Sequence, residues 1–247
     1  MSATVDITIP VYNEEEVLPR TIASLTEFLE TNLSNPWQVT IADNASTDST
    51  QTVSEMLCRK HPGVFYLRIP QKGRGRALRT AWLDSQADIV SYMDADLSTD
   101  LLHFPQLIKA LESGNHIAVG SRLSKDSQVS RGFKREFISR GYNLLINAMF
   151  FTGLPDAQCG FKALTRATAE AIVPNIKNNN WFFDTELLVI AAKRGFNIAS
   201  VPVKWIDDPA STVNIASTAK EDIKGLMRLR FGGIPQVEPP APLSPHR

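Results

Sequence analysis

Two acidic residues directly follow a short apolar segment in the stretch Ser91-Tyr92-Met93-Asp94-Ala95-Asp96-Leu97-Ser98. Residues 89–93 are apolar without a helical period, which predicts a buried strand. Two carboxylates that follow such a strand can hold Mg²⁺ or Mn²⁺, because hard cations prefer oxygen ligands and leave positions open for substrate phosphates. A turn in which Asp96 or Ser98 caps the next helix explains the same residues. The motif alone leaves both interpretations open.

Strands and helices alternate over the first 120 residues. The predicted strands are residues 6–11, 37–42, 64–69, 89–93 and 117–121, and the predicted helices are residues 15–32, 49–60, 74–85 and 101–112. This alternation is typical of an α/β fold with a doubly wound, mostly parallel sheet and helices on both faces. In such a sheet, ligands bind outside the carboxyl ends of the strands, which is where the two acidic residues stand.

The second half of the chain has a less regular pattern. Helices are predicted at residues 134–151, 167–172, 184–194 and 218–229, and strands at residues 158–164 and 198–205. Because no linker separates the halves, we expect one domain over residues 1–231, with residues 1–121 and 122–231 as its two halves. Residues 232–247 contain five prolines and few apolar anchors, so composition predicts a disordered tail.

Composition sets a few limits on function. The 26 basic and 26 acidic residues give a net charge of zero, so we expect no binding to nucleic acid, and any anion site must be local. Cys58 and Cys159 provide neither a disulfide framework nor a zinc spacing. No apolar run approaches the ~20 residues that span a bilayer, and the N-terminus leads into a strand without a signal peptide. These features favour the cytosol.

Four polar turns follow the first four predicted strands. They are Pro10-Val11-Tyr12-Asn13-Glu14, Asp43-Asn44-Ala45-Ser46-Thr47-Asp48, Lys72-Gly73-x-Gly75-x-Ala77 and Asp94-Ala95-Asp96. Because the carboxyl ends of parallel strands meet at one edge of a sheet, we expect these turns to face one crevice. In order and in type they resemble the inverting family 2 glycosyltransferases of the GT-A fold, which is Rossmann-like. The resemblance covers roughly residues 5–225.

Three motifs of the second half narrow this resemblance. They are Gly120-Ser121-Arg122, Asp156-Ala157-Gln158-Cys159-Gly160-Phe161-Lys162 and Trp181-Phe182-Phe183-Asp184-Thr185-Glu186-Leu187. They resemble the polyprenyl-phosphate branch, which includes dolichol-phosphate mannose synthases and, more closely, dolichol-phosphate glucosyltransferases. The resemblance implies metal-assisted, inverting transfer of a hexose from UDP-glucose or GDP-mannose to polyprenyl phosphate, with residues 122–231 as the acceptor half. The alternatives are a soluble hydroxyl acceptor with Asp156, Asp184 or Glu186 as base, and an inactive nucleotide-sugar-binding protein.

The resemblance also implies which residues surround the donor. They are Pro10, Tyr12, Glu14, Asp43, Lys72, Arg76, Asp94 and Asp96. Asp43 is expected to accept a hydrogen bond from a base N–H, and Lys72 and Arg76 to contact the diphosphate. Mg²⁺ or Mn²⁺ on Asp94 and Asp96 is expected to stabilise the leaving group. The structural alternatives are a strand-end cap for Asp43 and a solvated basic turn at Lys72.

A phosphate acceptor changes what the mechanism needs. A phosphate monoester has a second pKa near ~6, so at neutral pH it is already a dianion that needs cations more than a general base. The resemblance implies that Arg122, Arg135 and Ser139 bind this phosphate and that Asp184 and Glu186 lie beside the sugar or the acceptor. Arg135 and Ser139 are four residues apart and share a helix face. The alternatives are a solvated charge for Arg135 and helix-start capping by the two acids.

Three places depart from the family pattern, one of which is Ser211-Thr212-Val213, where many members have a basic residue after Ser. Asn44 stands where the family often has a second Asp, which changes the contacts expected to the diphosphate or the base. Ser98 stands where the mannose synthases have a Gln that helps the metal. The departure at Ser98 weakens the case for mannose and leaves two carboxylates for the metal.

Residues 134–151 combine a basic start with an apolar end. The basic residues are Lys134, Arg135 and Arg140, and the apolar ones are Leu144, Leu145, Met149, Phe150 and Phe151. Such a segment suits an anionic membrane surface, and an ordinary core helix with a polar start explains it equally well. With the polyprenyl acceptor in mind, we expect a cytoplasmic protein that associates peripherally with the inner face of a membrane.

Overall fold

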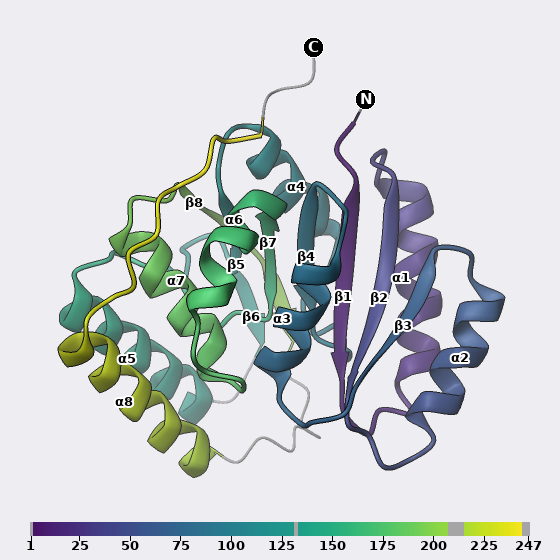
Figure 1. Cartoon of the computed structure of the whole chain (residues 1–247), viewed down its shortest axis with the longest axis horizontal. Helices are drawn as coiled ribbons and strands as arrows, with labels where there is room; N and C mark the ends of the chain where they lie inside the picture. The colour runs from purple at the N-terminus through teal and green to yellow at the C-terminus, as the bar shows by residue number, and fades with distance from the viewer. Residues whose placement is uncertain (1, 131–132, 207–214, 244–247) are drawn as a thin grey trace.

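Seven strands form one sheet in the order β3-β2-β1-β4-β7-β5-β8 (Figure 1). Their bounds are β1 (Val5–Val11), β2 (Trp37–Asn44), β3 (Val64–Ile69), β4 (Ile89–Met93), β5 (Ile117–Ser121), β7 (Phe161–Thr165) and β8 (Ile198–Pro202). The structure is a computed structural model that describes residues 2–130, 133–206 and 215–243, without the side chains of residues 133–135 and 215–217.

Helices cover both faces of this sheet. Their bounds are α1 (Leu18–Asn32), α2 (Thr50–Lys60), α3 (Arg74–Asp84), α4 (Phe104–Glu112), α5 (Phe133–Phe150), α6 (Arg166–Ile172), α7 (Phe182–Lys193) and α8 (Ile215–Gly232). In Figure 1, α3, α6 and α7 lie in front of the sheet and α1 lies behind it, while α5 and α8 run side by side at its lower left. The predicted α/β fold with a mostly parallel sheet is thereby confirmed.

The core explains why β1 and β4 occupy the centre of the sheet. Every residue of β4 is buried, as are six of the seven residues of β1. Strands that are covered on both faces read as continuous apolar runs, which is the pattern of residues 89–93 in the sequence. Both strands run parallel, with Val5 opposite Ile89, so their carboxyl ends reach the same edge.

The strand β7 is the exception to the parallel order, and it positions the site. It runs antiparallel between β4 and β5, with Phe161 opposite Met93. This register brings the turn that precedes β7 beside the acidic residues that follow β4. The strand predicted at residues 158–164 therefore begins later, because residues 156–160 form the turn.

Two other boundaries differ from the predictions. The helix predicted at residues 15–32 begins at Leu18, because Pro19 occupies its first turn, a position that proline favours. The strand predicted at residues 198–205 is divided into β8 and β9 (Lys204–Ile206), which pairs with β6 (Gln128–Ser130) in a separate two-stranded sheet.

Residues 233–243 follow an extended path along the protein, whereas their composition predicts disorder. Arg194 donates hydrogen bonds to the carbonyl oxygens of Ile234 and Pro235, and His116 Nε2 lies 3.0 Å from the carbonyl oxygen of Pro240. Apolar residues of the segment, such as Val237, pack against the core. Specific carbonyl acceptors, which composition does not reveal, therefore hold this part of the chain; residues 244–247 lie outside the described residues.

A membrane span is absent from the described part of the chain, because none of its helices is both long enough and apolar enough to cross a bilayer.

Candidate functional site

The turns after β1, β2 and β4 share an unusual backbone conformation. Asn13, Ala45 and Leu97 have positive φ angles of 57°, 69° and 51°. Residues other than glycine rarely adopt this conformation, and where they do, the strain often marks a functional site. The predicted crevice is therefore built from turns that the rest of the fold holds in a costly geometry.

The side chain of Asn44 ties three of the four turns together. Its Nδ2 donates to the carbonyl oxygen of Val11 at 2.6 Å, and its Oδ1 accepts from the backbone N–H of Gly73 at 3.0 Å. A carboxylate cannot donate to a carbonyl oxygen, so the aspartate that the family pattern suggests would lose the first of these bonds. Asparagine at position 44 therefore connects the turns by two hydrogen bonds, of which an aspartate could form only the one to Gly73.

Arg74 joins the two acidic motifs of the site. Its Nη2 lies 2.5 Å from Asp94 Oδ1, and its Nη1 lies 2.7 Å from Asp184 Oδ2. The guanidinium carbon lies 4.8 Å and 4.7 Å from the ring centroids of Tyr92 and Trp181, within the range of cation–π attraction. Arg74 was not among the residues predicted for the site, because it occupies an unspecified position of the glycine-loop motif; its charge was the only available signal.

Asp184 is buried at the centre of a polar network. Besides Arg74, it accepts hydrogen bonds from Tyr92 Oη at 2.5 Å and from the buried Lys162 Nζ at 2.9 Å. Burial by itself would raise the pKa of Asp184, but the two cations and the tyrosine lower it below its ordinary value. The carboxyl group is therefore ionised at neutral pH and held in one orientation.

Asp94 rests against the backbone of Gly160. A Cβ atom at position 160 would lie only 1.8 Å from Asp94 Oδ2, so glycine leaves the space that this carboxylate occupies. Asp96 is exposed, and its Oδ1 accepts from the backbone N–H of Ser98 at 2.9 Å. Of the two carboxylates in this motif, that of Asp94 packs against Gly160 and that of Asp96 faces solvent.

These two carboxylates fit a divalent metal ion. In the described part of the chain, no three His, Cys, Asp or Glu side chains converge into a metal cluster. Mg²⁺ binds through one or two carboxylates and takes its other ligands from water and substrate phosphates. The pair of Asp94 and Asp96 matches that donor set, and Gly160 provides the room in which Asp94 can hold its position.

Arg122 forms a bidentate ion pair with Asp156. The distances are 2.8 Å from Nε to Oδ2 and 3.0 Å from Nη2 to Oδ1, and the backbone N–H of Arg122 also donates to Oδ2. Although burial opposes ionisation, this partner holds the pKa of Asp156 below its ordinary value. Of the other predicted acceptor residues, Ser139 is half-buried on α5, and the side chain of Arg135 lies outside the described residues.

The predicted donor residues gather at the same edge. Lys72 Nζ lies 3.4 Å from the ring centroid of Tyr12, and Arg76 donates to the carbonyl oxygen of Lys72 at 3.0 Å. Pro10 is half-buried near the end of β1, and the backbone N–H of Glu14 donates to Thr50 Oγ1. The cation–π contact links the turn after β1 to the glycine loop.

Asp43 is fully buried, and its own protein neighbours use both of its oxygens. Oδ1 accepts from the backbone N–H of Ser46 at 2.8 Å, while Oδ2 accepts from Tyr66 Oη at 2.8 Å and from Arg68. These hydrogen bonds lower the pKa of Asp43 although burial acts in the opposite direction. In this arrangement a nucleotide base reaches Asp43 only after Arg68 or Tyr66 moves.

Glu186 lies away from Asp184. Residues two positions apart on a helix with 3.6 residues per turn point to nearly opposite sides, and the hydrogen bonds of Glu186 agree with this. Glu186 accepts from the backbone N–H groups of Lys177 and Asn178 at 3.1 Å and 3.0 Å, and from Arg228 Nη2 at 2.7 Å. The structure thus brings Asp94 and Asp184 together through Arg74 and leaves Glu186 on the far side of α7.

Asp222 on α8 is a buried carboxyl group beside the acceptor half of the site. One oxygen accepts from Gln158 Nε2 at 3.0 Å, and the other has no hydrogen-bond partner within the described residues. Burial raises the pKa of Asp222 to about 6. Because the folded-state pKa exceeds the ordinary value, Asp222 stabilises the fold when protonated, and that contribution is lost as the pH rises through about 6.

We therefore expect Asp222→Asn to stabilise the protein at pH 8 and not at pH 4. The difference between a pKa of about 6 and the ordinary pKa of an aspartate corresponds to about 3 kcal/mol, which sets the upper limit of the gain at pH 8. Chemical denaturation of both proteins at the two pH values measures this difference. A variant that is less stable than the wild type at pH 8 would contradict the prediction.

Comparison with known proteins gives a consistent result. The family model described as Glycosyl transferase family 2 matches residues 6–173. Glycosyltransferase AglD from Haloferax volcanii is 35% identical over 204 residues, which cover 81% of this chain and 33% of that protein. Dolichyl-phosphate beta-glucosyltransferase ALG5A from Trichomonas vaginalis is 31% identical over 229 residues, which cover 89% of this chain and 71% of that protein. The chain thus spans a third of the first relative and about seven tenths of the second.

A solved structure supports the fold. Glucosyl-3-phosphoglycerate synthase from Mycobacterium tuberculosis, crystallised with Mn²⁺, uridine diphosphate and phosphoglyceric acid, superposes with a TM-score of 0.70. The match covers 95% of this chain and 80% of that one, at 18% identity. At this level of identity the likeness concerns the fold.

Proposed function

Because the chain belongs to glycosyl transferase family 2, we propose that it transfers a hexose from a nucleotide-sugar to polyprenyl phosphate, with inversion at the anomeric carbon. The observation that carries this proposal is the similarity to dolichyl-phosphate beta-glucosyltransferases, which extends over 81–91% of the chain and therefore reaches into residues 122–231. The names of these relatives favour glucose over mannose as the transferred sugar, so of the two expected donors we propose UDP-glucose.

On the donor side, the polar turns would surround the nucleotide and its diphosphate. Lys72, which is exposed, and Arg76, which is half-buried, supply positive charge at the glycine loop, and Tyr12 lies against Lys72. Asp94 and Asp96 would hold Mg²⁺ or Mn²⁺, which stabilises the negative charge on the leaving diphosphate. For Asp43 to accept a hydrogen bond from the base, Arg68 or Tyr66 would have to move away from its carboxylate.

On the acceptor side, the low pKa values favour a phosphate over a hydroxyl group. A hydroxyl acceptor needs a general base, and an efficient base has a pKa near the operating pH. Asp156 and Asp184 are held below their ordinary pKa by ion pairs, and Glu186 is on the far side of α7. A phosphate dianion needs no base, so these paired acids suit it better.

A transfer assay with two nucleotide-sugar donors tests this function. Purified protein is incubated with polyprenyl phosphate, Mg²⁺ or Mn²⁺, and either UDP-glucose or GDP-mannose, and the lipid is extracted and analysed for sugar. We expect the sugar in the lipid fraction with UDP-glucose. Sugar only on a soluble hydroxyl acceptor would support the alternative transferase, and donor binding without turnover would support an inactive binding protein.

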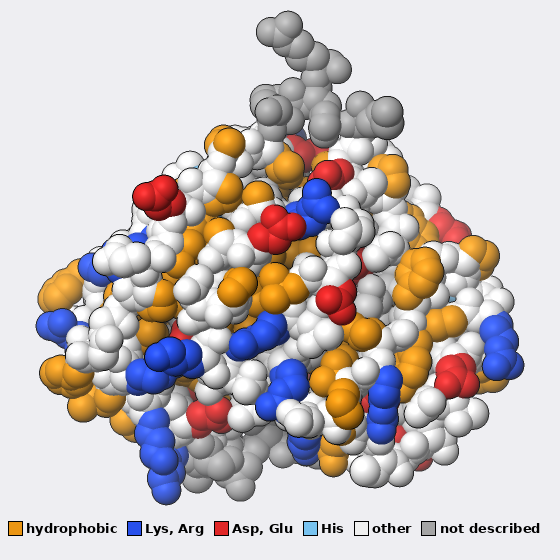
Figure 2. Space-filling model, viewed as in Figure 1, with side chains coloured by type: hydrophobic (Ala, Val, Ile, Leu, Met, Phe, Trp, Pro, Cys, Tyr) orange, Lys and Arg blue, Asp and Glu red, His pale blue; other side chains and the backbone are white. Residues whose placement is uncertain are grey.

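The helices α5 and α8 present an apolar surface to solvent, which we call the α5–α8 surface. Its exposed residues are Phe137, Ile138, Leu144, Leu145, Phe151, Ile223, Met227 and Phe231. Orange side chains gather over these helices at the left edge of Figure 2. An amphipathic surface of this kind, with basic residues beside it, suits an anionic membrane, where polyprenyl phosphate resides. We propose that this surface attaches the protein to the inner face of a membrane.

Phe151 and Phe150 should respond differently to substitution. Phe151 is 84% exposed, whereas Phe150 is 3% exposed and belongs to the core, so of the two alternatives for this segment the core helix holds for Phe150. We expect Phe151→Asp to reduce binding to lipid vesicles about tenfold or more, because a phenylalanine side chain gains about 1.5–3 kcal/mol when it leaves water.

Vesicle co-sedimentation measures this loss, with Phe65→Asp as the control. Phe65 is 53% exposed on the edge strand β3, away from the α5–α8 surface. The control should bind as the wild type does. Equal binding by Phe151→Asp and the wild type would contradict membrane attachment through this surface.

A further inference from the structure

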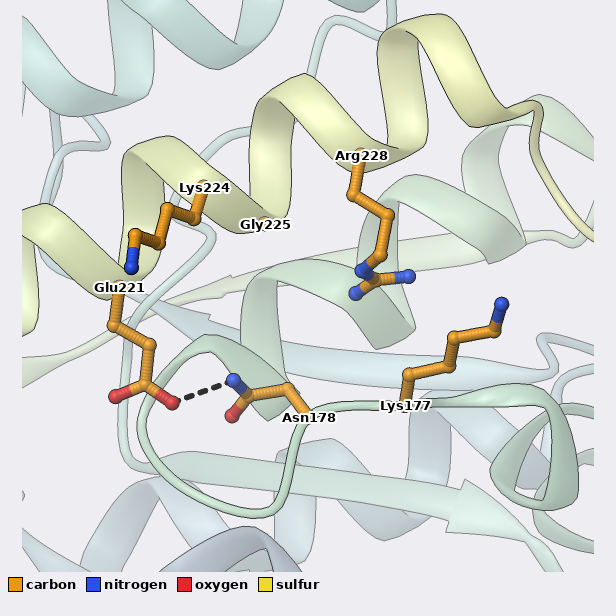
Figure 3. A pocket seen from close by; sticks show the side chains of 6 residues that line it. All are labelled: Lys177, Asn178, Glu221, Lys224, Gly225 and Arg228. Atoms are coloured by element: carbon orange, nitrogen blue, oxygen red, sulfur yellow. Dashed lines mark hydrogen bonds between the residues drawn. The ribbon is translucent and has the colours of Figure 1, made fainter.

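A basic pocket lies between α8 and the segment that leads into α7 (Figure 3). Its volume is about 220 Å³, several times the ~30 Å³ share of a water molecule. Its lining residues are Lys177, Asn178, Glu221, Lys224, Gly225 and Arg228. Figure 3 shows Lys177 and Arg228 facing one another at one end, with Lys224 and Glu221 at the other.

The pocket is separate from the candidate active site. Asp184 points from α7 toward Arg74 and Lys162, whereas Glu186 points from the opposite side of α7 to Arg228 of the pocket. The helix α7 therefore stands between the two locations, and none of the residues assigned to donor or acceptor lines the pocket.

The walls of the pocket are held in place by the fold. Glu186 is fully buried and fixes Arg228 by an ion pair of 2.7 Å. Gly225 forms part of the wall, and a Cβ atom there would lie 2.3 Å from the ring of Phe182, so only glycine allows α8 to approach α7 this closely. The guanidinium of Arg228 is thus held in a defined position at the wall of the pocket.

The charges that line the pocket are unbalanced. Its lining contains three cations and one carboxylate, Glu221, which accepts hydrogen bonds from Asn178 and Asn180; Glu186 behind the wall adds a second negative charge beside Arg228, so one positive charge remains in excess. Within the described residues, the ammonium groups of Lys177 and Lys224 have no hydrogen-bond or ion-pair partner. Arg228 has five N–H donors, and the bond to Glu186 uses one of them. An anion at the end where Lys177 and Arg228 face one another can accept hydrogen bonds from both, and Lys224, whose flexible side chain lies at the other end, can turn toward it.

The same helix also contributes to the α5–α8 surface. Lys224 and Arg228 are four residues apart and lie on one side of α8, next to the exposed Ile223 and Met227. In Figure 2, Lys and Arg side chains gather in the lower part of the face, over α8 and α3. The pocket therefore opens beside the surface that we propose to rest on a membrane.

We infer that this pocket binds the phosphate group of an anionic membrane lipid that is not the reacting acceptor. The inference rests on the proposed membrane attachment. Phosphate is favoured because a guanidinium offers parallel charge-assisted donors to its oxygens, and the two lysines add positive charge. Such a lipid would hold α8, and with it the neighbouring acceptor half, against the membrane.

The experiment compares two lysines of α8 on vesicles of matched surface charge. Lys224 lines the pocket, whereas Lys220 is exposed one turn earlier and does not. Vesicles contain phosphatidylcholine with either phosphatidic acid or oleate, so that only one kind offers an anionic phosphate monoester. We expect the wild type to prefer phosphatidic acid, and Lys224→Gln to lose about tenfold on these vesicles, which corresponds to one lost charged hydrogen bond.

Lys220→Gln should lose at most about fivefold, and equally on both kinds of vesicle, because diffuse attraction contributes about 1 kcal/mol per lysine. Equal losses for the two variants, or no preference for phosphatidic acid by the wild type, would overturn the inference. Competition by glycerol phosphate distinguishes a free phosphate from a lipid as the occupant. Hexose transfer to detergent-solubilised polyprenyl phosphate should be unchanged in Lys224→Gln, so failure of this site is distinguishable from failure of the proposed function.

Discussion

Gly160→Ala should lower kcat/KM for hexose transfer about hundredfold while the protein stays folded. A methyl group at position 160 would come within 1.8 Å of Asp94 Oδ2, so the carboxylate has to leave its present position. Asp94 is the end of a flexible side chain, so moving it costs the fold little. A displacement of about 1 Å in a catalytic constellation is enough for a loss of about 10²-fold.

The readout that isolates this mechanism is Mn²⁺ affinity in the presence of UDP, followed by electron paramagnetic resonance. We expect weaker Mn²⁺ binding in Gly160→Ala, and a comparable loss in Asp96→Asn, which removes the charge of the other proposed ligand and little volume. Gly141→Ala is the matched control, since no atom lies within 4 Å of a Cβ at position 141. If Gly160→Ala keeps wild-type activity and Mn²⁺ affinity, the position of Asp94 against Gly160 is unimportant for metal binding.

The fold was predictable from the sequence because its signals are local. The apolar run of residues 89–93 and the polar turns after the strands predict a mostly parallel sheet with these turns at one edge, and the structure has them there. The antiparallel insertion of β7 was not predictable, because a short strand carries no record of its partner. That insertion is what places Gly160 beside Asp94.

The site was predictable in composition and only partly in arrangement. Asp94 and Asp184 were both candidates, but nothing in the spacing of residues 90 positions apart indicates that Arg74 bridges them. Asp184 and Glu186 look equivalent in sequence, and the helical turn between them sends one to the site and the other to Arg228. Long-range ion pairs decide these assignments, and periodicity does not record them.

Arg135→Ala should reduce acceptor efficiency tenfold or more and leave donor binding nearly unchanged. A phosphate dianion has to approach the anomeric carbon next to a diphosphate, and fixed positive charge offsets that repulsion. A hydrogen bond to a charged group contributes about 1.5–3 kcal/mol, which corresponds to at least about tenfold in kcat/KM for the lipid. Arg135→Lys should recover little, because lysine keeps the charge and loses the paired donors.

Arg135 gives the cleaner test of the acceptor because Arg122 also has a structural role. Arg122→Ala would leave the buried Asp156 without its partner, and breaking a buried ion pair costs about 3–5 kcal/mol of stability. Arg140→Ala is the control, since Arg140 lies on the same helix and pairs with Glu136. Donor affinity is measured by UDP titration without lipid, and acceptor efficiency by transfer to polyprenyl phosphate. If Arg135→Ala leaves both KM and kcat for the acceptor at wild-type values, the phosphate acceptor is wrong. A hydroxyl acceptor, with one of the paired carboxylates released to act as base, would then take its place.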